Sequence, residues 1–167
     1  MNRCSLYWEN ILFLAATHLL GIAAVVHAAL VSFSPWTALL AAGWLGLCML
    51  STTGGYHRLF AHRTYRAAWP LRLFYLVFGA ASFEGPVLRW AAEHRLHHAA
   101  TDEEDDPHSI KKGFWWAHIG WLFYRTESGR IPPTPDLAAD PLIRFQDRFY
   151  LPLAILAGLA LPMALAA

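Results

Sequence analysis

Two charge-free stretches dominate the pattern of hydrophobic and polar positions. No Asp, Glu, Lys or Arg occurs between Glu9 and Arg58, a run of 48 residues, which is about twice what one helix needs to cross ~30 Å of hydrocarbon. Residues 31–36, Val-Ser-Phe-Ser-Pro-Trp, lie near its middle, and a proline beside an interfacial tryptophan is typical of a turn at a membrane surface. The pattern therefore predicts a transmembrane hairpin with spans near 10–31 and 36–56.

The second charge-free stretch runs from Phe149 to the last residue and contains two prolines. It is long enough for a third, kinked or broken span, which we place at 149–167. The polar segment 57–148 between the spans contains a short apolar run at 73–83, which predicts a helix in the membrane plane or buried in protein. We therefore expect an all-α integral membrane protein that forms a single domain over residues 1–167.

The composition agrees with this fold class. Hydrophobic residues make up 56% of the chain, charged residues 15%, and the mean hydropathy is +0.32. The net charge of +1 gives no indication of nucleic-acid binding. The two cysteines, which form no Cys-x-x-Cys pair, argue against a disulfide framework or a cysteine-rich zinc site. A secretory signal peptide is the alternative reading of the first stretch, but Glu9 and the second apolar span disfavour it.

The basic residues indicate an orientation. Twelve of the 13 Lys and Arg residues lie between Arg58 and Arg148, and the remaining one is Arg3. Positive charge collects on the cytoplasmic side of membrane proteins. We therefore expect a multi-pass protein whose N-terminus and segment 57–148 lie in the cytoplasm.

Five histidines form two clusters in that segment. The first holds His57 and His62, and the second holds His94, His97 and His98. Imidazole is the commonest side-chain ligand of metals and suits iron, copper, nickel and zinc. On an α-helix, five positions correspond to about 140° of rotation, so the first pair is expected to serve two neighbouring ions, whereas the second cluster falls within about 100° and can face one pocket. A coincidental run of solvated imidazoles is the alternative.

The other histidines carry weaker signals. His18 and His27 share a face of the first span, where hydrogen bonding to a neighbouring helix is the favoured interpretation and a haem or proton-path role the alternative. His118 lies among aromatic residues and is expected to be a packing or interfacial residue. Within the acidic run 102–106, we predict that Asp102 and Asp106 accept the second ring N–H of metal-bound histidines. The other acidic residues of the run are expected to be solvated.

These motifs resemble the membrane acyl-CoA Δ9 (stearoyl-CoA type) desaturases. Gly-Gly-Tyr-His57-Arg-Leu-Phe-Ala-His62-Arg is similar to the first histidine box of that family, and Glu93-His94-Arg-Leu-His97-His98 is similar to the second. The resemblance covers nearly everything from about residue 51 onward. It continues through Thr101-Asp102, Asp106-Pro107-His108-Ser109, residues 113–122 and residues 136–146.

The resemblance implies an oxygen-dependent di-iron enzyme that introduces a double bond into a saturated acyl chain. It assigns His57, His62, His94, His97 and His98 as ligands of two irons, with no catalytic residue beyond them. The implied substrate is an acyl-CoA or acyl-lipid. The implied electron donor is a separate cytochrome b5-like or ferredoxin-like protein with its reductase.

One departure concerns completeness. The family has a third histidine box and an additional ligand region after a fourth span, and neither occurs in these 167 residues. Since five histidines do not fill the shells of two irons, we expect a truncated or fragmentary desaturase, or one half of a split protein. The alternatives in function are a histidine-box hydroxylase or ketolase, and an inactive or purely metal-binding fragment. The Asp-Pro-His-Ser loop favours the desaturase.

Overall fold

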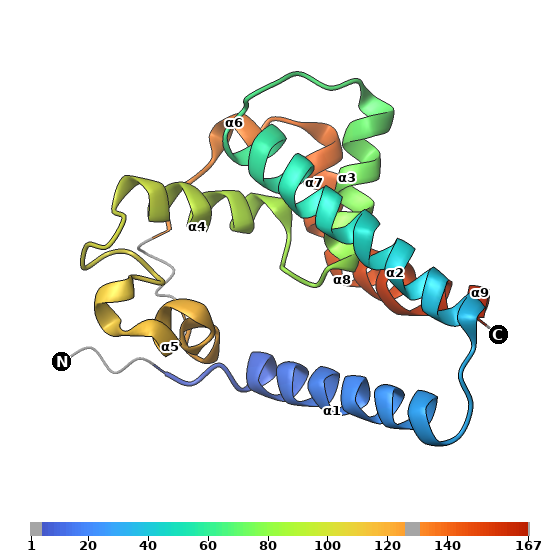
Figure 1. Cartoon of the computed structure of the whole chain (residues 1–167). Coiled ribbons are helices and arrows are strands. Elements are labelled where there is room, and N and C mark those ends of the chain that lie inside the picture. Colours follow the sequence, from blue (N-terminus) through green and yellow to red (C-terminus); the bar gives the residue numbers. More distant parts are fainter. Residues whose placement is uncertain (1–4, 126–130, 167) are drawn as a thin grey trace. The chain divides into compact units, whose positions relative to one another are not determined.

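The computed structural model describes residues 5–125 and 131–166, so residues 126–130 of the expected cytoplasmic segment and Ala167 of the third expected span lie outside the described part. Within it, the regular secondary structure is helical apart from one antiparallel bridge, between Leu6 and Tyr124 (Figure 1). The expected all-α membrane fold is confirmed for these residues.

The chain divides into two compact units. The first unit holds residues up to Pro35 together with 96–131, and the second holds 36–95 together with 132–167. Helix α4 (Val87–Ala99) begins in the second unit and ends in the first.

Among its described residues, the first unit contains one long helix, three short ones and the end of α4. Helix α1 (Trp8–Leu30) has no buried residue and is long and apolar enough to cross a membrane. The residue before α1 is hydrogen-bonded to a later segment of the same unit, because the Tyr7 N–H donates to the Phe123 carbonyl oxygen at 2.8 Å. The short helices are η2 (Ile110–Lys112), α5 (Phe114–His118) and η3 (Gly120–Phe123).

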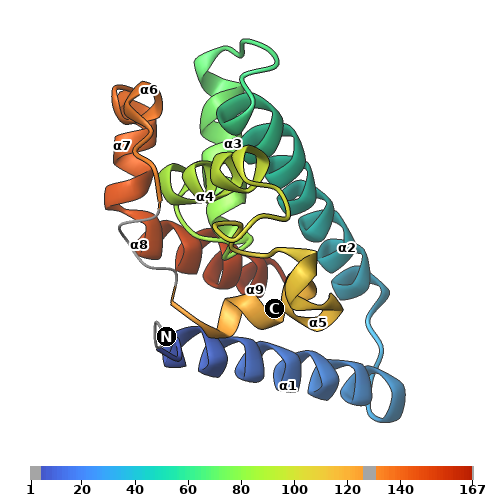
Figure 2. The same ribbon diagram turned by 90° about the vertical axis from the view of Figure 1, so that its left-hand side faces the viewer.

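The second unit is built around a helix that changes its winding. Helix α2 (Pro35–Leu50) continues without a break into the π-helix η1 (Ser51–Ala61), and together they are apolar enough for a second span. Helix α3 (Trp69–Ala81) lies along η1, as Figures 1 and 2 both show. The remaining helices are α6 (Pro135–Ala138), α7 (Pro141–Arg148), α8 (Tyr150–Ile155), the π-helix η4 (Leu156–Ala160) and α9 (Leu161–Ala166).

The C-terminal apolar stretch is bent. The axis of α7 makes an angle of 79° with the continuous helix Tyr150–Ala166, and the pair counts as a third span only if both limbs are taken together. The indole N–H of Trp44 donates to the Ala157 carbonyl oxygen at 3.0 Å and so joins this limb to α2. Because the Leu161 N–H bonds to the Leu156 carbonyl oxygen and Pro162 has no N–H, neither residue pairs with the Ala157 carbonyl oxygen, which is left to accept from the indole.

The core of the second unit lies beside the end of η1. Tyr56 is fully buried, and its hydroxyl accepts a hydrogen bond from the Gln146 side chain at 2.6 Å. The side-chain carbonyl oxygen of Gln146 in turn accepts a hydrogen bond from the backbone N–H of Val87, at the start of α4, at 3.1 Å. This buried chain of hydrogen bonds joins η1, α4 and α7, and it positions the helix ends that carry the first histidines.

Candidate metal centre

The winding of η1 brings His57 and His62 together. In a π-helix each N–H bonds to the carbonyl five residues back, and the His62 N–H bonds to the His57 carbonyl oxygen at 3.0 Å. The fifth residue therefore stacks above the first, and the Nε2 atoms of the two rings lie 3.1 Å apart. The expectation that this pair diverges by about 140° was wrong, because it assumed α-helical winding.

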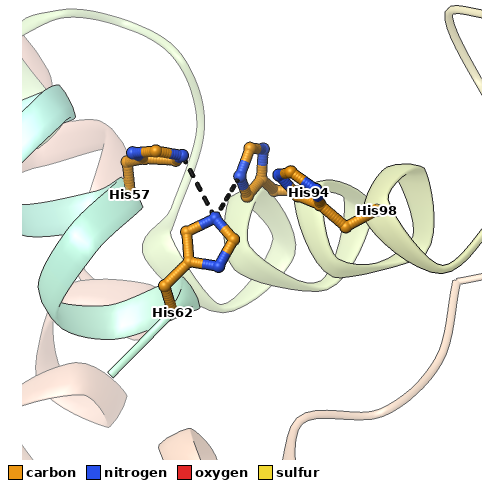
Figure 3. Close-up of side chains that lie close together, drawn as sticks. All are labelled: His57, His62, His94 and His98. Carbon is orange, nitrogen blue, oxygen red and sulfur yellow. Dashed lines mark hydrogen bonds between the residues drawn. The ribbon is translucent and has the colours of Figure 1, made fainter. Parts of the chain in front are cut away.

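Helix α4 adds His94 to this pair. The Nε2 atoms of His94 and His62 lie 2.9 Å apart, and Figure 3 shows the three rings turned toward one another. One ring nitrogen from each of His57, His62 and His94 lies within 4.8 Å of the others. His98, also drawn in Figure 3, follows His94 by one turn of α4, so both side chains leave the same side of that helix.

The spacing of these nitrogens matches a shared metal ion. Imidazole nitrogens bind first-row metals at about 2.1 Å, so two ligands at right angles lie about 3.0 Å apart. The two Nε2–Nε2 contacts, drawn as hydrogen bonds in Figure 3, are 3.1 and 2.9 Å long and so have the same length as that spacing. An all-imidazole donor set suits iron, zinc, copper or nickel, so the three residues fit the metal that the family resemblance implies without distinguishing iron from the others.

A tryptophan supports the His94 ring. The indole of Trp90 stacks on the imidazole with ring centres 4.8 Å apart and planes 21° from parallel. Its N–H donates to the Glu84 carboxylate at 2.9 Å, which fixes the indole in turn. Sequence reasoning missed Trp90, although its position four residues before His94 puts it one turn away on the same face.

Arg95 joins the end of η1 to α4. Its guanidinium donates to the carbonyl oxygens of Phe60 at 3.0 Å and Ala61 at 2.9 Å. Two further N–H groups donate to the two carboxylate oxygens of Asp136, at 3.0 and 2.9 Å. The Arg95 hydrogen bonds hold the pKa of Asp136 below its usual value, so this carboxylate is ionised at neutral pH. Neither residue was singled out from the sequence, because no local sequence pattern relates two positions that lie 41 residues apart.

The first unit contains a second group of potential ligands. The Nδ1 atom of His97 donates to the Asp106 carboxylate at 2.9 Å, and Asp106 is fully buried. The backbone N–H groups of Asp102 and His108 also donate to this carboxylate, at 2.9 and 3.0 Å. Burial raises the pKa of Asp106, but the hydrogen bonds outweigh it and leave the pKa below its ordinary value. With Nδ1 protonated, the His97 ring carries its lone pair on Nε2, the atom suited to a metal.

Two further residues, His108 and Asp102, surround this group, and His118 also belongs to the first unit. The His108 ring lies 4.2 Å from the His97 ring, and burial, followed by the neighbouring His97, lowers the pKa of His108. Asp102 has a positive φ of 60° and accepts the Ile110 N–H, so it shapes the loop around Asp106. His118 is exposed and stacks on Phe114, an exposed ring one turn before it. His108 was missed, although it follows Asp106 by two residues in the family's loop.

The division of the chain into units assigns His57, His62 and His94 to the second unit, where their ring nitrogens converge, and His97 and His98 to the first. We expected His94, His97 and His98 to point into one pocket, and that stays a prediction. The Nδ1 atom of His97 bonds to Asp106, which leaves Nε2 of that ring for a metal.

Comparison with known proteins places the chain in a family. The family model for fatty acid desaturases matches residues 34–167. Stearoyl-CoA desaturase 5 of Homo sapiens is 36% identical over 154 residues, covering 89% of this chain and 46% of its own length. Acyl-CoA Delta12-desaturase of Acheta domesticus is 35% identical over 166 residues, covering 96% and 46%. A probable acyl-CoA desaturase of Schizosaccharomyces pombe is 46% identical over 107 residues, covering 63% and 22%.

The chain therefore spans less than half the length of these curated relatives. The matched segment includes both histidine clusters and every helix from α2 onward. On the extent of the family match and the identity to relatives over most of the chain, this protein belongs to the fatty acid desaturase family.

Proposed function

We propose that this chain carries the first two histidine clusters of a membrane acyl-chain desaturase. The observation that carries the proposal is the convergence of the Nε2 atoms of His57, His62 and His94 at the end of an apolar helix. When bound there, iron would use O₂ to remove two hydrogens from a saturated acyl chain. His97 and His98 complete the ligand set of this chain in the proposal.

The remaining residues would orient the ligands. Asp106 keeps the proton of His97 on Nδ1 and so directs Nε2 toward the metal. Asp102 holds Asp106 through its backbone N–H. Trp90 covers one face of His94 and excludes water from it.

An apolar cavity in the second unit supports a lipid substrate. Its volume is about 470 Å³, and its walls include Trp44, Leu45 and Met49 of α2. Polar side chains, among them Thr52 and Glu84, lie on its lining at the end of α2 and the α3–α4 turn. A saturated hydrocarbon chain suits such walls because burying it there removes apolar surface from water. The substrate class is then an acyl-CoA, which the relatives' names specify, or an acyl-lipid.

The cellular setting of the proposal follows from the charge distribution. The N-terminus and segment 57–148, with the histidines, would face the cytoplasm. Electrons would come from a separate cytochrome b5-like or ferredoxin-like protein and its reductase.

The metal assignment is tested by removing single imidazoles. We expect His57→Ala, His62→Ala and His94→Ala each to weaken iron binding at least tenfold, because each opens a coordination position. His118→Ala is the control, since this ring packs on Phe114. Iron per protein is measured by mass spectrometry after dialysis against graded chelator. An equal loss in His118→Ala would contradict the assignment.

The reaction is tested through its product. The protein that contains this chain is expressed in a host without its own desaturase, and fatty acids are analysed by gas chromatography. A monounsaturated product supports the proposal. Hydroxylated product would support the hydroxylase alternative, and bound iron without any product would indicate a metal-binding module.

A further inference from the structure

Arg95 belongs to the second histidine cluster by sequence, but its side chain contacts η1, the π-helix that carries His57 and ends just before His62. We propose that Arg95 is a positioning residue that sets the separation of His62 and His94, with Asp136 holding its guanidinium in place. The inference rests on the proposed function, because it concerns the same metal ligands. It adds two residues, on α4 and α6, that are not ligands themselves.

The carbonyl groups that Arg95 binds are those that a helix end leaves unpaired. Phe60 and Ala61 are the last two residues of η1, and their carbonyl oxygens have no partner further along the helix. A cation is also favoured at this end by the helix dipole. His62 follows directly as the C-cap residue. Fixing the two carbonyls before it therefore fixes the backbone from which the His62 ring projects.

The other end of the connection is one residue from His94. Because Arg95 and His94 are neighbours on α4, a displacement of η1 relative to Arg95 is also a displacement of His62 relative to His94. The present distance between their Nε2 atoms is 2.9 Å. A separation about 1 Å larger would open the angle between two bonds of about 2.1 Å from roughly 90° to roughly 135°, far from the angles of tetrahedral or cis octahedral coordination.

Asp136 makes the guanidinium rigid. It receives two parallel N–H bonds from Arg95, the arrangement in which a planar guanidinium has the least freedom. The guanidinium of Arg63, whose side chain is largely exposed, lies 3.6 Å from the same carboxylate. The Arg95 and Asp136 side chains are only 28% and 23% exposed, so water competes weakly for the pair. Lysine has the charge but not the fork, and it cannot make these four contacts together.

The test measures metal binding directly, with Co²⁺ as the probe. The detergent-purified protein is titrated, and both the dissociation constant and the ligand-field absorption at saturation are recorded. Arg95→Gln, Arg95→Lys and Asp136→Asn should bind Co²⁺ roughly 10–100-fold more weakly, the range for residues that orient ligands. Their saturated spectra should shift toward that of His62→Ala. Arg89→Gln is the matched control, since Arg89 pairs on α4 with Glu93 at 2.9 Å and should leave both readouts unchanged.

A double variant separates positioning from general stabilisation. If Arg95 acts through His62, then Arg95→Gln combined with His62→Ala should bind Co²⁺ no more weakly than His62→Ala alone. Penalties that multiply would overturn the inference, as would an unchanged spectrum in Arg95→Gln or full rescue by Arg95→Lys. Where Arg95→Gln loses helical content, Asp136→Asn decides by the same criteria. Wild-type protein that binds no Co²⁺ would overturn the proposed function too, whereas normal binding in both Arg95→Gln and Asp136→Asn overturns this inference alone.

Discussion

Tyr56, one residue before His57, is tightly packed. Its ring is fully buried, and it faces the backbone of Gly79 on α3. A methyl group at Gly79 would lie 2.2 Å from a ring carbon of Tyr56. The glycine therefore permits the close approach of α3 and η1, and a larger residue would push on the backbone that carries His57.

We predict that Gly79→Ala lowers the free energy of unfolding by about 1–3 kcal/mol, the usual cost of overpacking a filled site. Gly43→Ala is the control, because nothing lies within 4 Å of the added methyl group. Thermal unfolding in detergent, followed by circular dichroism, compares the two. Equal stability of both variants would show that Tyr56 can move aside without cost.

Among the elements, η1 depends on the buried hydrogen bonds that join it to α4 and α7. Gln146 is 1% exposed and bonds with both the Tyr56 hydroxyl and the Val87 N–H. A buried polar group without its partner costs more than the hydrogen bond itself gains. The start of α4 and the middle of η1 are thus held by one side chain on α7.

Gln146→Leu should therefore destabilise the protein by about 1–3 kcal/mol, because it leaves the Val87 N–H unsatisfied in the core. Arg144→Gln, at an exposed position of the same helix, should change the stability little. Both are measured as shifts in the thermal midpoint. A midpoint for Gln146→Leu equal to that of Arg144→Gln would mean that another group satisfies Val87.

The contact of α6 with α4 should depend on pH. The pKa of Asp136 is lowered by its hydrogen bonds from Arg95, so the ionised carboxylate contributes stability above its unfolded pKa of about 4. This contribution is lost as the pH falls through the still lower folded pKa. The stability difference between wild type and Asp136→Asn should accordingly shrink below about pH 4. Thermal unfolding of the two proteins along a pH series checks this, and a constant difference would contradict it.

For the whole molecule, the division into two units passes through α4, between Arg95 and Leu96. The second histidine cluster is therefore divided, with His94 in one unit and His97 in the other. The proposed cytoplasmic placement of the whole segment 57–148 requires both parts on the same side of the membrane. Accessibility from outside the cell tests that placement.

Cysteine labelling gives the test of orientation. In a background without Cys4 and Cys48, an impermeant reagent applied from outside should label Ser32→Cys and leave Glu104→Cys unlabelled. Both positions are exposed in the structure, so burial does not confound the comparison. Permeabilised cells, in which both should react, provide the control. The reverse pattern in intact cells would refute the proposed orientation.

Local pattern by itself determined the fold class and the family. Long charge-free runs predict membrane helices because length and apolarity act on each segment alone. The histidine boxes are short contiguous motifs, so their spacing can be read from the sequence without knowing how the helices pack. Asp106, nine residues from its histidine partner, lies in a loop close enough for the same reasoning to nominate it.

The tertiary structure decided what depends on contacts between distant segments. No local pattern in residues 51–61 predicts the π-helical winding that turns His57 and His62 toward each other. Gly54 and Gly55 in that stretch are packed closely against Tyr75 of α3. The same holds for Arg95 and Asp136, whose partnership spans 41 residues. A sequence pattern records the preferences of neighbours, whereas the winding of η1 and the reach of Arg95 are set by which helices pack side by side.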